Sequence, residues 1–281
     1  MNRTAGGVVL LVATLAWPLT ARAERIERTF PATTETVVEV KNLNGQVEIH
    51  AWDQPQVRVV AVRRSPAVET HFEQAANRIH IHTHLLQASA PASDRVVDYE
   101  IWAPPYAQLK LRVEAGTLQV QGFNEDVSVE AVAAKVVLRN LGGHTEVNTL
   151  SGSVEAERCS GRLEATSISG TLRFLDTESR YLVANTTAGG ISYEGDFQRG
   201  GSYEFISHDG AIDLLVPGNA SFELNANSVQ GEVTNELPLT PRTDGRVPQR
   251  SGMRSLLGTV HTGDAMVRAT SFSGTIRVRK R

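Results

Sequence analysis

Three histidines stand at alternate positions of one short segment: His80, His82 and His84. The residues between them are apolar or small, so residues 78–85 predict a strand with the three imidazoles on one face. Imidazoles spaced in this way can bind Zn²⁺ or Cu²⁺, with His71 or His50 as a further ligand. The alternative is a solvent-facing polar stripe, because metal sites usually draw their ligands from separate elements. The three histidines are therefore candidate ligands, and we expect no other cofactor.

Four arginines follow one another at intervals of four positions: Arg242, Arg246, Arg250 and Arg254. On a helix they would form a basic stripe, but two glycines and a proline interrupt the segment. We therefore expect a basic loop. It is a candidate for docking to an anionic envelope glycolipid or to the acidic flank of another copy of the chain. The alternative is a solvated loop without a partner.

The sequence contains no familiar catalytic motif: no Gly-x-Ser-x-Gly elbow, no His-Glu-x-x-His pair and no Walker loop. The adjacent residues Ser207, His208 and Asp209 do not predict a catalytic triad, because the members of a triad come from separate elements. The single cysteine, Cys159, fits a small buried residue beside a turn better than an intermolecular disulfide.

The first residues predict an export signal. Arg3 gives a positive start, residues 6–16 form a short apolar run, and residues 21–23 have the small-x-small form of a cleavage site. The apolar run is shorter than the ~20 residues that cross a bilayer. We expect residues 1–23 to be a signal peptide. The mature chain is then exported to the periplasm or the cell surface and has no transmembrane segment.

Charge is distributed unevenly along the expected mature chain. Without Arg3 and Arg22 it has 26 basic and 31 acidic residues, a formal charge of −5. Residues 241–281 contain nine Lys or Arg and only two Asp, so the remainder is strongly acidic. An acidic body argues against nucleic-acid binding. Few aromatic residues are available as a platform for a glycan: Trp52, Trp102 and Tyr106.

A short unit recurs along the chain: a glycine or alanine followed, two and four positions later, by apolar side chains. Glycine permits a tight corner, and the alternation predicts a short strand with one buried face. Successive units begin 18–21 residues apart, at Gly116, Ala134, Gly152, Gly170, Gly189, Gly210 and Gly231. Further copies begin at Gly45 and Gly274.

Two strands and two corners in each 18–21 residues predict one coil of a β-solenoid, and the coils must stack to bury their apolar faces. The expected fold class is therefore all-β, with a solenoid-like stack of short strands. The dipeptides Asn44-Gly45 and Asp209-Gly210 are also hairpin signals, so an antiparallel β-sandwich is the alternative. Four outer positions of successive coils predict a mixed-charge ladder: Glu155, Arg173, Ser192 and Asp213.

Residues 24–106 have longer predicted strands, and we interpret them as an N-terminal β-region that caps the stack. Residues 107–281 form the repeat domain. Within it, residues 238–257 contain three prolines and interrupt the period, which predicts a loop. The basic final segment, residues 275–281, is expected to be a terminal strand whose charge discourages edge-to-edge growth.

Three features carry a resemblance to a known family: the segment VKNLNGQVEIHAWD at residues 40–53, the serial Ser-Gly strands, and the closing segment ATSFSGTIRV at residues 269–278. Together they resemble a bacterial family of exported β-strand repeat proteins described as candidate adhesins, a domain of unknown function. The resemblance covers roughly residues 40–278 and implies a solenoid-like fold with an envelope or surface role. It brings no established catalytic residues.

We therefore expect a non-catalytic envelope or cell-surface protein that acts in adhesin-like binding or as a structural scaffold. Its partner is an envelope or surface component, a protein or a glycan, or a second copy of the chain. The alternative is an exported carbohydrate-active enzyme on a β-helix. Such an enzyme needs a pair of carboxylates in a groove.

Overall fold

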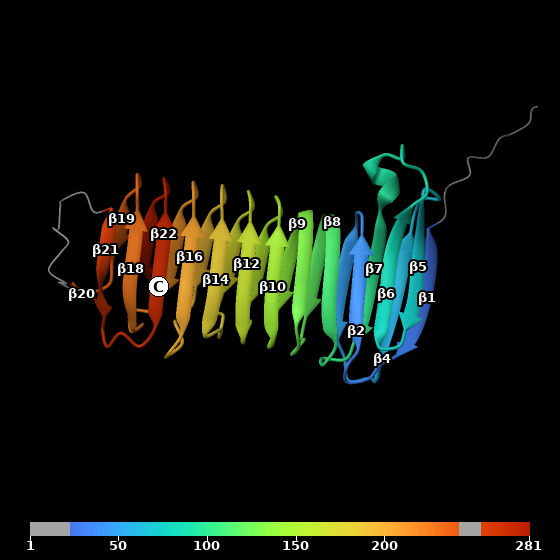
Figure 1. Ribbon diagram of the computed structural model, residues 1–281, viewed down its shortest axis with the longest axis horizontal. Coiled ribbons are helices and arrows are strands. Elements are labelled where there is room, and N and C mark those ends of the chain that lie inside the picture. The colour runs from blue at the N-terminus through green and yellow to red at the C-terminus, as the bar shows by residue number, and fades with distance from the viewer. Residues whose placement is uncertain (1–22, 242–253) are drawn as a thin grey trace, which may run out of the picture.

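The computed structural model describes residues 23–241 and 254–281. Apart from one short 3₁₀ helix, η1 (Ala92–Arg95), the regular elements of these residues are β-strands, which run side by side along an elongated body (Figure 1). The expectation of an all-β fold is confirmed. Residues 1–22 of the expected signal peptide lie outside the described residues. Within the described ranges, no helix is long and apolar enough to cross a membrane.

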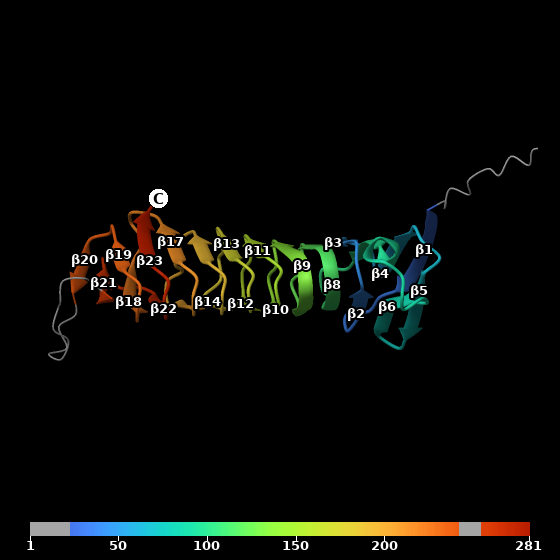
Figure 2. The same ribbon diagram turned by 90° about the horizontal axis from the view of Figure 1, so that it is seen from above.

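The strands form two layers, face A and face B, with one continuous core between them (Figure 2). The order along face A is β5 (Val68–Ala75), β6 (Arg78–Leu85), β2 (Val37–Asn42), the first halves of β8 (Gln108–Gln121) and β9 (Val127–Arg139), β10 (His144–Thr149), β12 (Arg162–Ser167), β14 (Tyr181–Thr186), β16 (Ser202–Ser207), β22 (Met266–Ser271), β18 (Phe222–Ser228), β21 (Ser255–Val260) and β20 (Leu239–Pro241).

The order along face B is β1 (Glu24–Pro31), β4 (Gln56–Arg63), β7 (Val97–Ala103), β3 (Gln46–Ala51), the second halves of β8 and β9, β11 (Val154–Glu157), β13 (Leu172–Leu175), β15 (Ile191–Glu194), β17 (Ile212–Val216), β23 (Ile276–Lys280) and β19 (Val233–Asn235). Because β8 and β9 each pass from face A to face B, all the strands belong to one hydrogen-bonded sheet.

Neighbouring coils stack in parallel at the spacing that the repeat predicts. On face B, Val154 lies opposite Leu172, and Leu172 lies opposite Ile191, so each of these coils stacks on the preceding copy of the repeat. This parallel register confirms the solenoid-like stack and rules out an antiparallel sandwich for the repeat. The predicted outer ladder is also present, in the order Glu155, Arg173, Ser192 and Asp213.

In six of the described coils, one corner combines a glycine with a buried hydroxyl group, whereas the coil of β9 has Ala134 and Ala131 at these positions. A Cβ on Gly170 would lie 1.9 Å from the carbonyl oxygen of Gly152 in the preceding coil, so no larger residue fits. Three positions earlier, Ser167 accepts a hydrogen bond of 2.7 Å from the Gly170 N–H. We call such residues the corner hydroxyls; the same bond joins Thr149 to Gly152, Thr186 to Gly189, Ser207 to Gly210, Ser228 to Gly231, and Ser271 to Gly274.

The last two strands of the chain lie inside the stack. β22 lies between β16 and β18, and β23 lies between β17 and β19, with parallel pairing throughout. The strands that follow β17 in the sequence, β18 and β19, do not stack directly on β16 and β17. The position between them is occupied by β22 and β23, from the C-terminal part of the chain (Figure 1). Although Gly231 is the next copy of the repeat after Gly210 in the sequence, Gly274 lies between them in the stack.

The expected final strand is present as β23, but the expectation that it lies at the edge of the stack is wrong, because β23 lies between β17 and β19. As an inner strand, β23 directs its basic side chains toward acidic residues of neighbouring coils. Arg277 and Arg279 contact Asp213, and Arg281 contacts Glu194 and Asp176. The expected loop at residues 238–257 contains β20 and the start of β21, while residues 242–253 lie outside the described residues.

Residues 24–106 extend both faces of the stack. β2 pairs in parallel with β8 on face A, and β3 pairs in parallel with β8 on face B. The Gly45 copy of the repeat therefore stacks on Gly116, where a Cβ would lie 2.0 Å from the Gly45 carbonyl oxygen. Antiparallel pairs also occur here, joining β1 to β4, β4 to β7, and β5 to β6.

Aromatic side chains fill the part of the core that follows β13. Phe197 stacks on Tyr193 with ring centroids 4.9 Å apart, and it also contacts Tyr203 and Phe222. The wider steps of the repeat, from β13 to β15 and from β15 to β17, occur in this region, where the coils must enclose larger side chains. Cys159 is buried, as predicted, and burial raises the pKa of its thiol.

Candidate functional site

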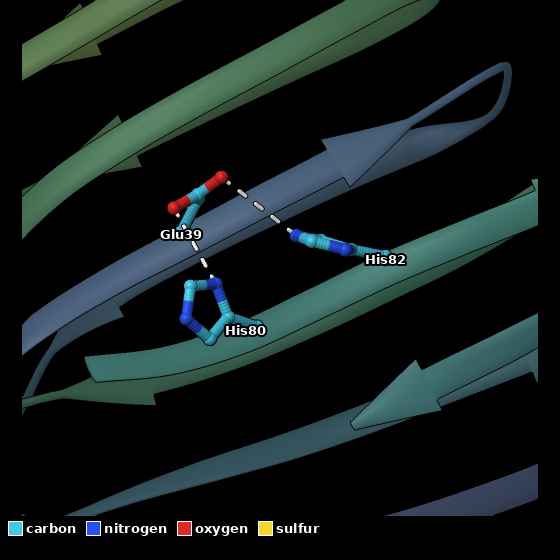
Figure 3. A group of neighbouring side chains, drawn as sticks. All are labelled: Glu39, His80 and His82. Carbon is cyan, nitrogen blue, oxygen red and sulfur yellow. Dashed lines mark ion pairs between the residues drawn. The ribbon is translucent and has the colours of Figure 1, made fainter. Parts of the chain in front are cut away.

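Two of the three candidate histidines meet a carboxylate on the outer surface of face A. β6 places His80 and His82 outward because the alternating residues Ile79 and Ile81 fill the core. β2 runs parallel to β6 and places Glu39 directly opposite His80. Glu39 therefore lies between the two imidazoles, which approach it from a neighbouring strand (Figure 3).

The three side chains are close enough to act together. His80 Nδ1 lies 3.4 Å from Glu39 Oε2, and His82 Nε2 lies 3.8 Å from Glu39 Oε1. One ligand atom from each residue lies within 4.8 Å of the other two. The imidazole rings meet edge to face, with centroids 5.6 Å apart. Two nitrogens and one carboxylate thus form a compact, half-buried donor set.

Lys41 contacts the same carboxylate. Its Nζ lies 2.9 Å from Glu39 Oε1, and this hydrogen bond lowers the pKa of the Glu39 carboxyl. Burial, and then the charge of Lys41, lower the pKa of His82. His82 Nε2 is buried without a hydrogen-bond partner among the described residues. The cluster therefore combines a carboxyl group whose surroundings favour the ionised form with an imidazole whose surroundings favour the neutral form.

The other histidines considered as ligands lie outside this cluster. His84 is on the outer face, as predicted, but its ring contacts His82 and His71 at centroid distances of 6.1 Å. His71, on β5, lies opposite His82 and approaches Glu73 at 3.6 Å. His50 is on face B beside Trp102. Glu39 was not among the predicted ligands, since it comes from a strand that lies far from β6 in the sequence.

A second outer feature runs along the corner of the stack. The residue two positions before the corner glycine, or before Ala134 in the coil of β9, is exposed in these seven coils, and at five places it is a large apolar residue, 41–52% exposed. Backbone hydrogen bonds place these residues in neighbouring coils. We call the five the corner ridge: Val132, Leu150, Ile168, Phe272 and Val229. Thr187 and His208 occupy the remaining two positions, and His208 stacks on Phe272 with centroids 4.8 Å apart.

From β10 onward the corner ridge is bordered by an uncharged row. The outward residues two positions earlier are in register from coil to coil and carry amide, hydroxyl or apolar side chains: Asn148, Thr166, Asn185, Ile206, Thr270 and Asn227. The row begins after Glu130, which lies opposite Asn148. Charged ladders occupy other outer rows, such as the one that contains Glu155 and Arg173. The border of the ridge is therefore an uncharged row of the outer surface in these coils.

Of the four candidate arginines, Arg254 alone falls within the described residues. Its guanidinium donates a hydrogen bond of 3.0 Å to the carbonyl oxygen of Val229, the last residue of the corner ridge. Its own carbonyl oxygen accepts a bond of 2.7 Å from the Ser228 N–H. Arg254 thus joins the start of β21 to the end of β18. Arg242, Arg246 and Arg250 lie outside the described residues.

The adjacent Ser207, His208 and Asp209 do not assemble into a triad. The Ser207 hydroxyl accepts from the Gly210 N–H and donates to the Gly189 carbonyl oxygen, so it faces the backbone corner. His208 Nδ1 lies 2.9 Å from Asp209 Oδ1. Ser207 is a corner hydroxyl with a structural role.

The three candidate aromatic residues are half-buried rather than open platforms. The rings of Trp52 and Trp102 have centroids 6.4 Å apart, and the Arg58 guanidinium lies 4.8 Å above Trp102. The Trp52 indole N–H donates a bond of 2.8 Å to the carbonyl oxygen of Gln56. Tyr106 lies in the turn before β8. The chain's own residues therefore use part of each tryptophan surface.

Comparisons with known proteins identify the family of the chain. The sequence model described as Toastrack DUF4097 matches residues 13–279. A candidate cell adhesion protein from Clostridium sporogenes is 8% identical, with a TM-score of 0.31, over 92% of this chain and 100% of that chain. A candidate adhesin from Bacteroides fragilis is 10% identical, with a TM-score of 0.32, over 93% of this chain and 99% of that chain. No curated protein matches. Because the family match spans nearly the whole sequence, this protein belongs to the Toastrack DUF4097 family.

Proposed function

We propose that this protein is a non-catalytic envelope or cell-surface protein with adhesin-like binding, and that it holds its partner along the corner ridge. The observation that carries the proposal is the alignment of five exposed, large apolar side chains on the coils of the stack. Single exposed apolar residues are common on protein surfaces, but apolar residues gathered on neighbouring coils, here three before and two after the positions of Thr187 and His208, are typical of an interaction site.

The surroundings of the ridge indicate the chemistry of the partner. The bordering amides and hydroxyls can donate and accept hydrogen bonds, and from Asn148 onward the row carries no formal charge. An uncharged portion of an envelope component, a glycan or a protein segment, suits such a surface better than a highly charged polymer. The rigid stack keeps the ridge straight, so it requires little ordering when a partner binds.

A carbohydrate-active enzyme is less well supported. Glycoside hydrolysis requires two carboxylates on either side of the scissile bond, one of them available as an acid. Several outer carboxylates of the coils are instead in ion pairs: Glu157 with Arg139, Asp213 with Arg277, and Glu194 with Arg281. These pairs favour a structural use of the carboxylates.

The test is binding of purified protein to an envelope preparation of the source cells. Replacing Leu150, Ile168 and Phe272 together with Asn should abolish binding, and binding of the unaltered chain should persist at high salt because the ridge is uncharged. Leu86→Asn is the matched control, since Leu86 is 57% exposed and lies outside the ridge. Equal binding by the triple variant and the control would refute the proposal.

A further inference from the structure

We propose that Glu39, His80 and His82 bind one divalent transition-metal ion, Zn²⁺ or Cu²⁺, on the outer surface of face A. The donor set consists of two imidazole nitrogens and one carboxylate oxygen, which both ions accept. The ligands come from two strands, so the parallel register of β2 and β6 fixes their separation. This site lies apart from the corner ridge, and the two proposals stand independently.

The distances suit a tetrahedral ion. Zinc with nitrogen and oxygen ligands at about 2.0–2.1 Å holds neighbouring ligand atoms about 3.3–3.5 Å apart. The two imidazole nitrogens lie 3.4 and 3.8 Å from the oxygens of Glu39. These two distances run to different oxygens of the carboxylate, and the three ligand atoms lie within 4.8 Å of one another, so side-chain rotations have to bring them together around the ion. Three protein ligands leave a fourth position for water or for a group from a partner.

The unpartnered nitrogen of His82 is the second observation that points to an ion. A buried polar atom nearly always has a partner, and His82 Nε2 has none within the described protein. It faces the Glu39 carboxylate at 3.8 Å, too far for a hydrogen bond. An ion between the two groups would satisfy both at once.

Lys41 is the competitor for this position. Its ammonium group contacts Glu39 Oε1 at 2.9 Å and supplies a positive charge where the ion would lie. The Lys41 side chain is 43% exposed, so it can turn into solvent when the ion binds. Lys41 therefore weakens binding without blocking it, and its removal should strengthen binding.

The neighbouring strands neither strongly favour nor exclude a cation. Glu73 on β5 lies opposite His80, and Lys110 on β8 lies opposite Glu39, so the nearest flanking charges are of opposite sign. Beside Glu39 lies an open hollow of about 340 Å³, which Lys110 and Arg112 also line.

The experiment is isothermal titration of the full mature chain, residues 24–281, with ZnCl₂ and with CuCl₂. We expect one equivalent with micromolar affinity. Glu39→Gln, His80→Gln and His82→Gln should each weaken binding at least about tenfold. His84→Gln and His71→Gln are the matched controls from the same outer face, and they should bind like the unaltered chain. Lys41→Gln should bind more tightly.

A second readout identifies the ligands directly. Substoichiometric Cu²⁺ should broaden the imidazole NMR signals of His80 and His82 before those of His50 and His208, which lie elsewhere. Circular dichroism of each variant verifies that the strands remain folded. Absence of binding heat with both ions would overturn the proposal. So would binding that survives the double replacement of His80 and His82, or that requires His84.

Discussion

The corner hydroxyls offer a sharp test of what holds the coils together. Replacing Ser207 with Ala removes one oxygen and leaves the Cβ in place. The Gly210 N–H then loses an acceptor at 2.8 Å, and the Gly189 carbonyl oxygen loses a donor at 3.2 Å. Ser207 is 2% exposed, so water cannot easily replace its hydroxyl. At about 1 kcal/mol for each lost bond, the free energy of unfolding should fall by about 2 kcal/mol.

Urea unfolding followed by circular dichroism measures this loss, and thermal unfolding gives a second estimate. For a domain of this size, about 2 kcal/mol corresponds to a decrease in Tm of about 4–8 °C. Ser202→Ala is the control, because Ser202 is exposed at the start of the same strand, β16, and should change stability by less than about 0.5 kcal/mol. If Ser207→Ala and Ser202→Ala lower the free energy of unfolding by the same small amount, the corner hydroxyls do not stabilise the stack.

Three further outcomes follow from the fold. Gly170→Val should cost more than about 3 kcal/mol in unfolding free energy or prevent folding, because even a Cβ would lie 1.9 Å from the Gly152 carbonyl oxygen; normal stability would contradict this. Deleting residues 264–281 removes β22 and β23, so limited proteolysis should cut β18 and β19 first and spare β10 to β15; equal protection of both regions would count against the inserted arrangement. Tyrosinate absorbance should show Tyr99 ionising near pH 12 rather than 10.0, because burial raises its pKa to about 12. The folded pKa lies above the unfolded one, so the buried phenol stabilises the fold below pH 10 and loses this effect as the pH rises toward 12; Tyr99→Phe should flatten that part of the stability curve.

The repeat could be predicted because most coils bring the same corner position close to the backbone of the preceding coil. A Cβ at Gly152 or Gly170 would lie 1.8 or 1.9 Å from a backbone oxygen of the preceding coil, so glycine recurs at a fixed phase. The position of the final coil could not be predicted in this way. Local alternation encodes a coil but not its neighbours, and the copies at Gly231 and Gly274 both fit beside Gly210. The available signal was Asn235, a polar residue where the other copies have an apolar one, and it lies on β19, which pairs with β23 on face B.

Two of the three residues of the candidate site, His80 and His82, could be predicted from the sequence, and Glu39 could not. Alternation alone places His80 and His82 on one face, because the side chains of a strand point to opposite sides in turn. The position of Glu39 beside the histidines depends on the pairing of β2 with β6, which is a long-range contact that no local sequence pattern encodes. The corner ridge could not be found from the constant glycine. Its residues vary in type, and only the stacking of the coils brings them into one row.

The inner position of β22 and β23 also determines when this chain can finish folding. Coils that follow one another in sequence and in space can form one after another as the chain is made. The coil of β18 and β19 cannot, because its neighbour on the inner side consists of β22 and β23, which follow it in the sequence. A chain without residues 266–281 therefore has a gap inside the stack, between β16 and β18 on face A and between β17 and β19 on face B, rather than a shorter stack. Without β22 and β23, the coil of β18 and β19 lacks its inner neighbour, and we expect it to open locally and to be cleaved by proteases more readily than the coils before it.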